Sequence, residues 1–147
     1  MKKLFLAGDV GGTKTVLALY SSDLGPDRPL EEATFPSIDY AALEEVIQAF
    51  MAGKNASVAR ASIGVAGPVR GTQAHVTNLL WVVDTSSISQ AIGGSPVNLL
   101  NDLEAIAYAV PSLASSDLET LNPGEPEEHG ALGVIAPGLS EIGRAHV

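Results

Sequence analysis

Two glycines between two strand-like segments constrain the start of this chain more than any other feature. Leu4 to Gly8 and Thr15 to Tyr20 are apolar and rich in β-forming residues, and Gly11-Gly12 lies between them. Glycine readily supplies the positive φ of a tight turn, so the pattern predicts a β-hairpin. A third strand is expected near residues 32–35, after a loop that contains glycine and proline. The chain is therefore expected to begin with three antiparallel strands.

Helical and strand patterns alternate after these strands. Apolar residues at helical spacing predict a helix from about Tyr40 to Ala52, which Gly53 can cap. Thr85 or Ser86 is the expected N-cap of a later, short helix. The other expected elements are strands at 59–66, 74–76, 96–100 and 131–136, a loop at 78–84, helices at 85–92 and 102–111, and a polar surface segment at 111–129. This order predicts an α/β domain with a mixed sheet flanked by helices.

Composition narrows the functional classes. The chain of 147 residues has a net charge of −9, which would repel the phosphate backbone of a nucleic acid. No apolar run approaches the roughly 20 residues of a membrane-spanning helix, and the apolar start ends too early for a secretion signal. Cysteine is absent, so disulfides and thiolate metal sites are excluded. We therefore expect a cytoplasmic protein that binds neither nucleic acid nor membranes.

The segment Gly8-Asp9-Val10-Gly11-Gly12-Thr13-Lys14-Thr15 is a candidate phosphate-binding turn. It differs from a P-loop because Thr13 separates Gly12 from Lys14 and because a strand, not a helix, is expected to follow. Glycines still allow backbone N–H groups to approach a phosphate, and Asp9 can hold Mg²⁺ through water. A plain glycine hairpin without a ligand explains the same residues equally well, so both interpretations stay open here.

Asn101 and Asp102 form a second candidate site. They place an amide and a carboxylate directly after the strand expected at 96–100, at the edge where α/β proteins bind ligands. Asp102 is a candidate group to accept a proton from a substrate hydroxyl during phosphoryl transfer. A capping box, with Asn101 as N-cap and Glu104 at the third helical position, explains the same residues without a ligand. The two interpretations are compatible, because a capped helix start holds both side chains rigidly.

Four stretches of the chain together carry a family resemblance. They are Gly-Asp-Val-Gly-Gly-Thr at 8–13, Ile-Gly-Val-Ala-Gly-Pro-Val at 63–69, Thr77-Asn78 with Trp81, and Asn101-Asp102 with the helix behind it. In order and spacing they resemble the bacterial glucokinases of the sugar kinase–actin superfamily. The resemblance extends to about Gly138. It implies a ribonuclease H-like (actin-like ATPase) domain with a mixed five-stranded sheet, and the ATP-dependent phosphorylation of glucose to glucose 6-phosphate.

The resemblance also implies roles for individual residues. Asn101 would bind sugar hydroxyls, and Asp102 would be the general base for the 6-hydroxyl. Asn78 and Gly67 would line the sugar pocket, and Asp9 would lie near Mg²⁺. The residues implied in ATP binding are Gly8, Asp9, Val10, Gly11, Gly12, Thr13 and Lys14.

The chain departs from this family in its length and its last residues. Family members are about twice as long and continue into a Gly-Thr-Gly-Leu-Gly type loop, whereas Leu139-Ser140-Glu141 follows Gly138 here. We therefore expect residues 1–138 to be the N-terminal lobe of a two-lobed sugar kinase and residues 139–147 to be a divergent tail that need not be native. The other half would carry a His and two Glu sugar ligands and most of the adenosine site.

These departures affect the expected activity. Without the second lobe, the isolated chain is expected to be inactive, and its apolar last strand is expected to make it a homo-oligomer. Two alternatives remain open at this point. One is a non-catalytic sugar-sensing module on a sugar-kinase fold, and the other is a fragment that only associates with itself.

Overall fold

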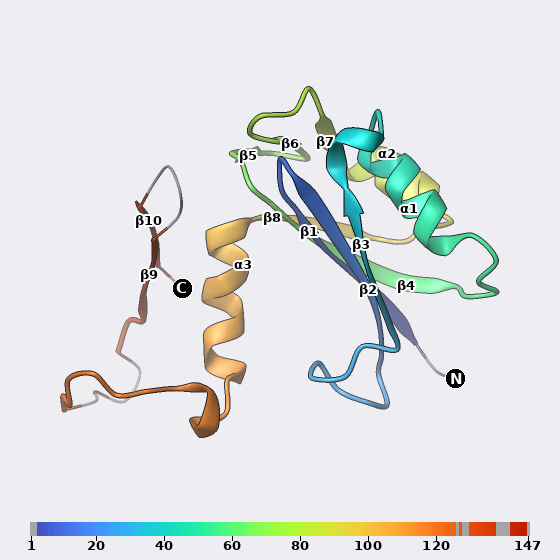
Figure 1. The fold of residues 1–147 in the computed structure, drawn as a ribbon. Coiled ribbons are helices and arrows are strands. Elements are labelled where there is room, and N and C mark those ends of the chain that lie inside the picture. The colour runs from blue at the N-terminus through green and yellow to red at the C-terminus, as the bar shows by residue number, and fades with distance from the viewer. Residues whose placement is uncertain (1–2, 126, 128–129, 138–141, 147) are drawn as a thin grey trace. The chain divides into compact units, whose positions relative to one another are not determined.

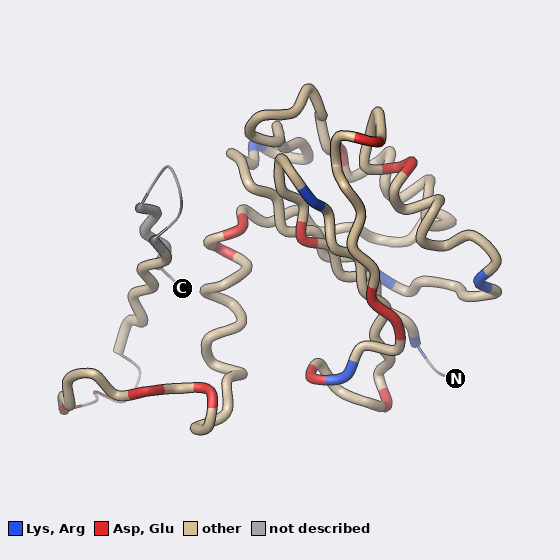
Figure 2. The backbone as a smooth tube through the Cα atoms, in the orientation of Figure 1, with Lys and Arg blue, Asp and Glu red and all other residues tan. Residues whose placement is uncertain are grey.

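The computed structural model describes residues 3–125, 127, 130–137 and 142–146, and it divides into two compact units (Figure 1). The first unit spans residues 1–102 and the second spans residues 103–147. Acidic residues occur along both units, with basic residues more sparsely placed (Figure 2). In the part of the chain that the structure describes, no helix is long and apolar enough to cross a membrane.

A mixed five-stranded sheet forms the centre of the first unit. The spatial order of its strands is β3-β2-β1-β4-β8. The β1–β2 and β2–β3 pairs are antiparallel, whereas β4 runs parallel to β1 and β8 runs parallel to β4. The strands are β1 (Leu4–Val10), β2 (Lys14–Ser21), β3 (Glu31–Pro36), β4 (Val58–Val65) and β8 (Val97–Asn101). The three initial strands and the mixed sheet predicted from the sequence are confirmed.

Two helices pack beside each other in the first unit, α1 (Leu43–Met51) and α2 (Thr85–Ala91) (Figure 1). The buried residues of α1 recur at the spacing of one helical face and pack with inward-facing residues of β1, β2 and β4. This core includes Leu6, Val10, Leu17, Leu43, Val46, Ile47, Phe50, Ile63, Val65 and Ile88. The face that carries the sequence periodicity is therefore the face that the fold buries.

The predicted start of α1 at Tyr40 is wrong by three residues. Residues 37–39 form a short 3-10 turn, and Ala42 has an extended backbone, so the helix begins at Leu43. The side chain of Glu45 accepts a hydrogen bond from the Ala41 N–H at 2.8 Å, which satisfies a backbone donor ahead of the helix. Gly53 has a φ of +74° directly after the helix, as its predicted capping role requires.

A small antiparallel sheet contains β5 (Val69–Arg70), β6 (Gln73–His75) and β7 (Val82–Asp84). The loop predicted at 78–84 is thus wrong for its last three residues, which pair with β6. The N-cap of α2 is Asp84, not Thr85 or Ser86, because the Asp84 carboxylate accepts a hydrogen bond from the Ser86 N–H at 2.8 Å. The cap is therefore one residue earlier than Thr85, and the Asp84 carboxylate satisfies a backbone N–H at the start of α2.

The second unit begins within helix α3 (Asp102–Ala109), whose first residue belongs to the first unit. The helix predicted as far as Pro111 ends at Ala109, and Val110–Ser112 is a 3-10 turn, because proline lacks the N–H that an α-helix needs. A second 3-10 turn covers Ser115–Asp117, and residues 111–125 are exposed as predicted.

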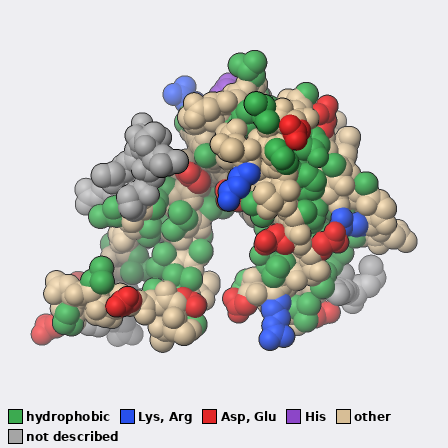
Figure 3. Space-filling view, viewed as in Figure 1, with side chains coloured by type: hydrophobic (Ala, Val, Ile, Leu, Met, Phe, Trp, Pro, Cys, Tyr) green, Lys and Arg blue, Asp and Glu red, His purple; other side chains and the backbone are tan. Residues whose placement is uncertain are grey.

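The predicted last strand occurs two residues later than expected. It is β9 (Gly133–Pro137), and it pairs antiparallel with β10 (Ile142–His146) rather than with the five-stranded sheet. Large apolar side chains are exposed on this unit, and Figure 3 shows apolar groups on its surface. They include Ile106, Tyr108, Leu113, Leu118, Leu121, Leu132 and Ile135.

Candidate functional site

The two predicted motifs meet at the carboxyl ends of three neighbouring parallel strands. Asp9 of β1 is in register with Gly64 of β4, and Val65 of β4 is in register with Asn101 of β8. Adjacent strands are about 4.8 Å apart, so the ends of β1 and β8 are separated by about 10 Å. The sheet therefore places the glycine turn and the Asn101-Asp102 pair at one edge, where open α/β sheets bind ligands.

The glycine turn is closed by a hydrogen bond from the Gly11 N–H to the Lys14 carbonyl at 3.0 Å. The prediction that Gly11-Gly12 supplies a positive φ is wrong, since neither residue is among the described glycines with positive φ. Gly12 is needed for a different reason. A Cβ atom on Gly12 would lie 2.5 Å from the carbonyl oxygen of Thr77 and 3.4 Å from the Cβ of Asn78. The turn thus packs directly on the Thr77-Asn78 segment.

The segment after β4 links the turn to the predicted sugar-binding residues. The Ala66 N–H donates to the Val10 carbonyl, and the Thr77 N–H donates to the Ala66 carbonyl, both at 2.9 Å. A Cβ atom on Gly67 would overlap the backbone of His75, so only glycine fits there. Asn78 is exposed with a φ of +68°, a conformation that asparagine tolerates better than most residues.

Asn101 is the last residue of β8, and Asp102 is the first residue of α3. The Asn101 Nδ2 donates a hydrogen bond to the Gly67 carbonyl oxygen at 3.0 Å. Only the NH₂ group of an amide can donate to a carbonyl, so this contact fixes which way the amide faces. Gly67, Asn78 and Asn101 are thus brought into one neighbourhood. Asp102 directly follows Asn101 in the sequence, and its side chain is exposed.

The seven residues predicted to bind nucleotide differ in what they can present to a ligand. Gly11 and Gly12 are half-buried in the turn itself. Asp9, Thr13 and Lys14 have exposed side chains at the turn. Val10 is fully buried in the core, and a Cβ atom on Gly8 would lie 2.8 Å from the Cδ1 of Ile63. The Val10 side chain therefore packs in the core, and Gly8 leaves the space that Ile63 fills.

The donor set at the turn fits Mg²⁺. Asp9 offers one exposed carboxylate beside the glycine turn, and Mg²⁺ is commonly held by one or two carboxylates together with phosphates and water. Among the residues that the structure describes, no group of three or more His, Cys, Asp or Glu side chains forms a metal site.

Sequence reasoning missed two residues beneath the turn, Thr15 and Ser37. Both are completely buried, and their hydroxyl oxygens are 3.0 Å apart. Thr15 lies in phase with Leu17 and Leu19 on the inward face of β2. A polar residue in an inward-facing apolar series was the available signal. Ser37 carried no such signal, because it lies in a turn that the sequence pattern did not predict.

The pKa of Asp84 is shifted by hydrogen bonds at the N-cap of α2 and not by groups of the candidate site. A hydrogen bond from the Ser86 hydroxyl, with further bonds from Gln73 and the Ser86 N–H, lowers the pKa of Asp84 from 3.8 to about 2. These donors favour the charged carboxylate. Asp84 is therefore a structural acid.

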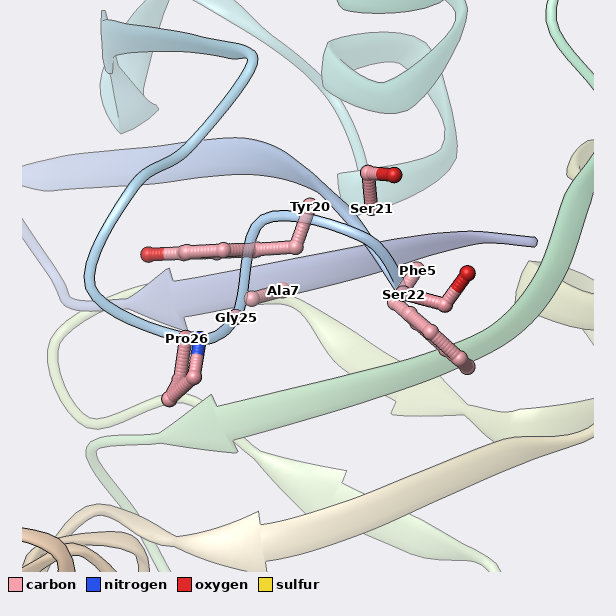
Figure 4. Close-up of a pocket in the computed structure, with 7 residues that line it drawn as sticks. All are labelled: Phe5, Ala7, Tyr20, Ser21, Ser22, Gly25 and Pro26. Carbon is pink, nitrogen blue, oxygen red and sulfur yellow. The ribbon is translucent and has the colours of Figure 1, made fainter. Parts of the chain in front are cut away.

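An open groove occurs elsewhere on the first unit (Figure 4). Its lining includes Phe5, Ala7, Tyr20 and Pro26 and contains no acidic or basic side chain. Phe5 lies towards the start of β1, whereas the glycine turn follows the end of that strand. The groove is thus distinct from the candidate site.

Comparison with known proteins identifies the family. The glucokinase family model matches residues 6–147. A glucokinase from Synechocystis sp. is 36% identical, with 97% of this chain and 43% of that protein covered. A crystal structure of a glucokinase from an Antarctic psychrotroph superposes with a TM-score of 0.85 at 30% identity, covering 98% of this chain and 46% of that one.

A more distant structure shares the fold. It is a ROK family glucokinase from Streptomyces griseus in complex with glucose and AMPPNP, with a TM-score of 0.64 at 21% identity over 98% of this chain and 45% of that one. The fold is the actin-like ATPase fold that the resemblance implied. The chain spans less than half the length of the curated relatives it matches. Because the family model matches residues 6–147 and the Synechocystis relative aligns with 97% of this chain, the chain belongs to the glucokinase family.

Proposed function

We propose that this chain is the N-terminal lobe, over residues 1–138, of an ATP-dependent glucokinase that forms glucose 6-phosphate. The observation that carries the proposal is the placement of the glycine turn and of Asn101-Asp102 at one edge of the parallel strands. One motif suits a phosphate and the other suits a hydroxyl, so the edge offers the two halves of a phosphoryl-transfer site. Residues 139–147 stay outside the proposed lobe, as a divergent tail.

The reaction would be an in-line displacement at the γ-phosphorus of ATP. The 6-oxygen of glucose attacks phosphorus, the bond between the γ-phosphorus and the bridging oxygen breaks, and ADP leaves. Asp102 accepts the proton of the 6-hydroxyl as the new bond forms. Such reactions depend mainly on positioning and on stabilisation of phosphate charge, and a positioned general base contributes about 10²–10⁴-fold.

The glycine turn would hold the phosphates through its backbone N–H groups, with Lys14 exposed beside them. When bound, Mg²⁺ would supply positive charge that offsets the charge of the phosphates, and Asp9 is the residue to hold it through water. The Streptomyces griseus relative was solved with glucose and AMPPNP, which fits a site of this type on this fold.

Asn101 would orient the sugar beside Asp102. Its amide is held by the Gly67 carbonyl, so its direction is set before a ligand arrives. Asn78 and Gly67 would complete this side of the sugar pocket. The parent protein would act in the cytoplasm, as the sequence predicted. The isolated chain would be inactive, because one lobe cannot enclose both substrates and exclude water.

A coupled assay for glucose 6-phosphate tests the proposal. The full-length parent, supplied with Mg-ATP, should phosphorylate glucose, and the isolated chain should not. A folded parent that binds glucose but forms no glucose 6-phosphate would instead support the sugar-sensing alternative.

A further inference from the structure

Two buried hydroxyl groups support the glycine turn from inside the fold. The Ser37 Oγ donates a hydrogen bond to the Gly11 carbonyl at 2.9 Å, and the Ser37 N–H donates to the Thr13 carbonyl at 3.0 Å. The Thr15 Oγ1 lies 3.0 Å from the Ser37 Oγ. Ser37 thus contacts two backbone carbonyls of the turn, and Thr15 contacts Ser37.

The hydrogen bonds between these groups have a fixed direction. A serine hydroxyl carries one hydrogen, and that of Ser37 is directed to the Gly11 carbonyl. The Thr15 hydroxyl must therefore donate to the Ser37 oxygen. Both side chains are 0% exposed, so water cannot replace a missing partner. Loss of the Ser37 hydroxyl takes the partner of both the Gly11 carbonyl and the Thr15 hydroxyl, whereas loss of the Thr15 hydroxyl removes the donor to the Ser37 oxygen. The loss of a hydrogen-bond partner in a buried site is costly.

This arrangement orients a backbone donor of the turn. The peptide between Gly11 and Gly12 is planar and trans, so its carbonyl and its N–H point in opposite directions. Because the carbonyl points to Ser37, the Gly12 N–H points away from the buried hydroxyls. A backbone N–H fixed in this way before binding is what an anion-binding turn requires.

We infer that Ser37 and Thr15 are positioning residues that hold the glycine turn in its phosphate-binding geometry. The inference rests on the proposed function of the turn, and neither side chain touches the ligand. It adds to the site two residues that lie beneath it.

The first test compares two serines in the full-length parent. Ser21 is also buried, at 2% exposure, and it lies at the opposite end of β2, where its oxygen accepts a hydrogen bond from the Asp23 N–H at 3.2 Å. Ser37→Ala should weaken Mg-ATP binding about tenfold and change glucose binding less than about twofold, by calorimetric titration. Ser21→Ala should leave the Mg-ATP affinity unchanged.

A second pair of variants separates positioning from packing. Thr15→Val keeps the shape of the side chain and removes the hydroxyl, whereas Thr15→Ser keeps the hydroxyl and removes a methyl group. A positioning role predicts that Thr15→Val weakens Mg-ATP binding and that Thr15→Ser does not. A packing role predicts the reverse order, because only Thr15→Ser leaves a cavity.

Hydrogen exchange adds a readout that needs no ligand. The amides of residues 11–14 should exchange faster in Ser37→Ala than in Ser21→Ala, when both variants are folded. Equal effects of Ser37→Ala and Ser21→Ala on exchange and on Mg-ATP affinity would overturn the inference. If the wild-type parent itself fails to bind Mg-ATP, the proposed function fails instead, so the two failures are distinguishable.

Discussion

The side-chain amide of Asn101 donates a hydrogen bond to the carbonyl oxygen of Gly67 at 3.0 Å. This contact joins the end of β8 to the segment that follows β4. It connects two of the residues that the family resemblance implied for the sugar pocket. The amide is therefore held by the protein itself, at the edge where Asp102 begins α3.

In the full-length parent, Asn101→Asp should destabilise the fold and weaken glucose binding. A carboxylate cannot donate to the Gly67 carbonyl, and two acceptors would face each other in a half-buried position. We expect a loss of about 1–3 kcal/mol in the free energy of unfolding, measured with urea. Asn98→Asp, at an exposed position of the same strand, is the matched control and should change stability little. Equal losses in the two variants would contradict this account.

Gly12→Val should weaken Mg-ATP binding more than glucose binding in the parent. Even a Cβ atom at this position would lie 2.5 Å from the Thr77 carbonyl, so the turn must shift away from its geometry. Gly124→Val is the control, because a Cβ atom at Gly124 meets nothing within 4 Å. Calorimetric titration of both ligands provides the measurement. Equal loss of both ligands would indicate a general defect of the fold.

Asp84 should make the free energy of unfolding depend on pH in the acidic range. Its pKa is lowered from 3.8 to about 2 by hydrogen bonds that exist only in the folded state. A depressed folded pKa stabilises the fold above pH 3.8, and this contribution is lost as the pH falls towards 2. The stability difference between wild type and Asp84→Ala should therefore shrink from pH 5 to pH 2 in urea unfolding. Asp84→Asn can still accept the capping bond without titrating. A difference between wild type and Asp84→Ala that does not change over this range would contradict the assignment.

The isolated chain should associate with itself. Ile135 on β9 is 72% exposed, and Leu121 in the preceding segment is 91% exposed. Exposed apolar side chains and strand edges promote association. Sedimentation velocity should show oligomers whose fraction rises with concentration, and Ile135→Lys should reduce that fraction. A wild-type chain that stays monomeric at high concentration would refute the prediction.

Local sequence patterns predicted the elements with strong periodicity. Leu43, Val46, Ile47, Phe50 and Met51 recur at helical spacing and predicted α1. The first four are buried, and Met51 is half-buried against the core. The helix start was less accurate, because the 3-10 turn at Ser37–Asp39 and the extended Ala42 have no periodic pattern. Short strands such as β5 and β7 were missed for a similar reason. Two or three residues cannot show alternation, and their pairing depends on contacts along the small sheet.

The candidate site was predictable in its positions but not in its physical causes. Asn101-Asp102 followed a strand-like segment, so its place at a sheet edge could be predicted. The need for Gly12 was predicted from positive φ, whereas the structure shows close packing on Thr77. Contacts between residues distant in sequence, such as that of Ser37 with Gly11, leave no local pattern. Those contacts had to be read from the structure.

The central claim is that Asp102 is the general base, and its replacement in the full-length parent tests it most directly. Asp102→Asn should retain the fold and glucose affinity while kcat falls about 10²–10⁴-fold in the coupled glucose 6-phosphate assay. Glu104→Gln removes one carboxylate from the same helix and is the matched control, with a kcat close to that of the wild type. A correctly folded Asp102→Asn enzyme with near wild-type kcat would contradict the account.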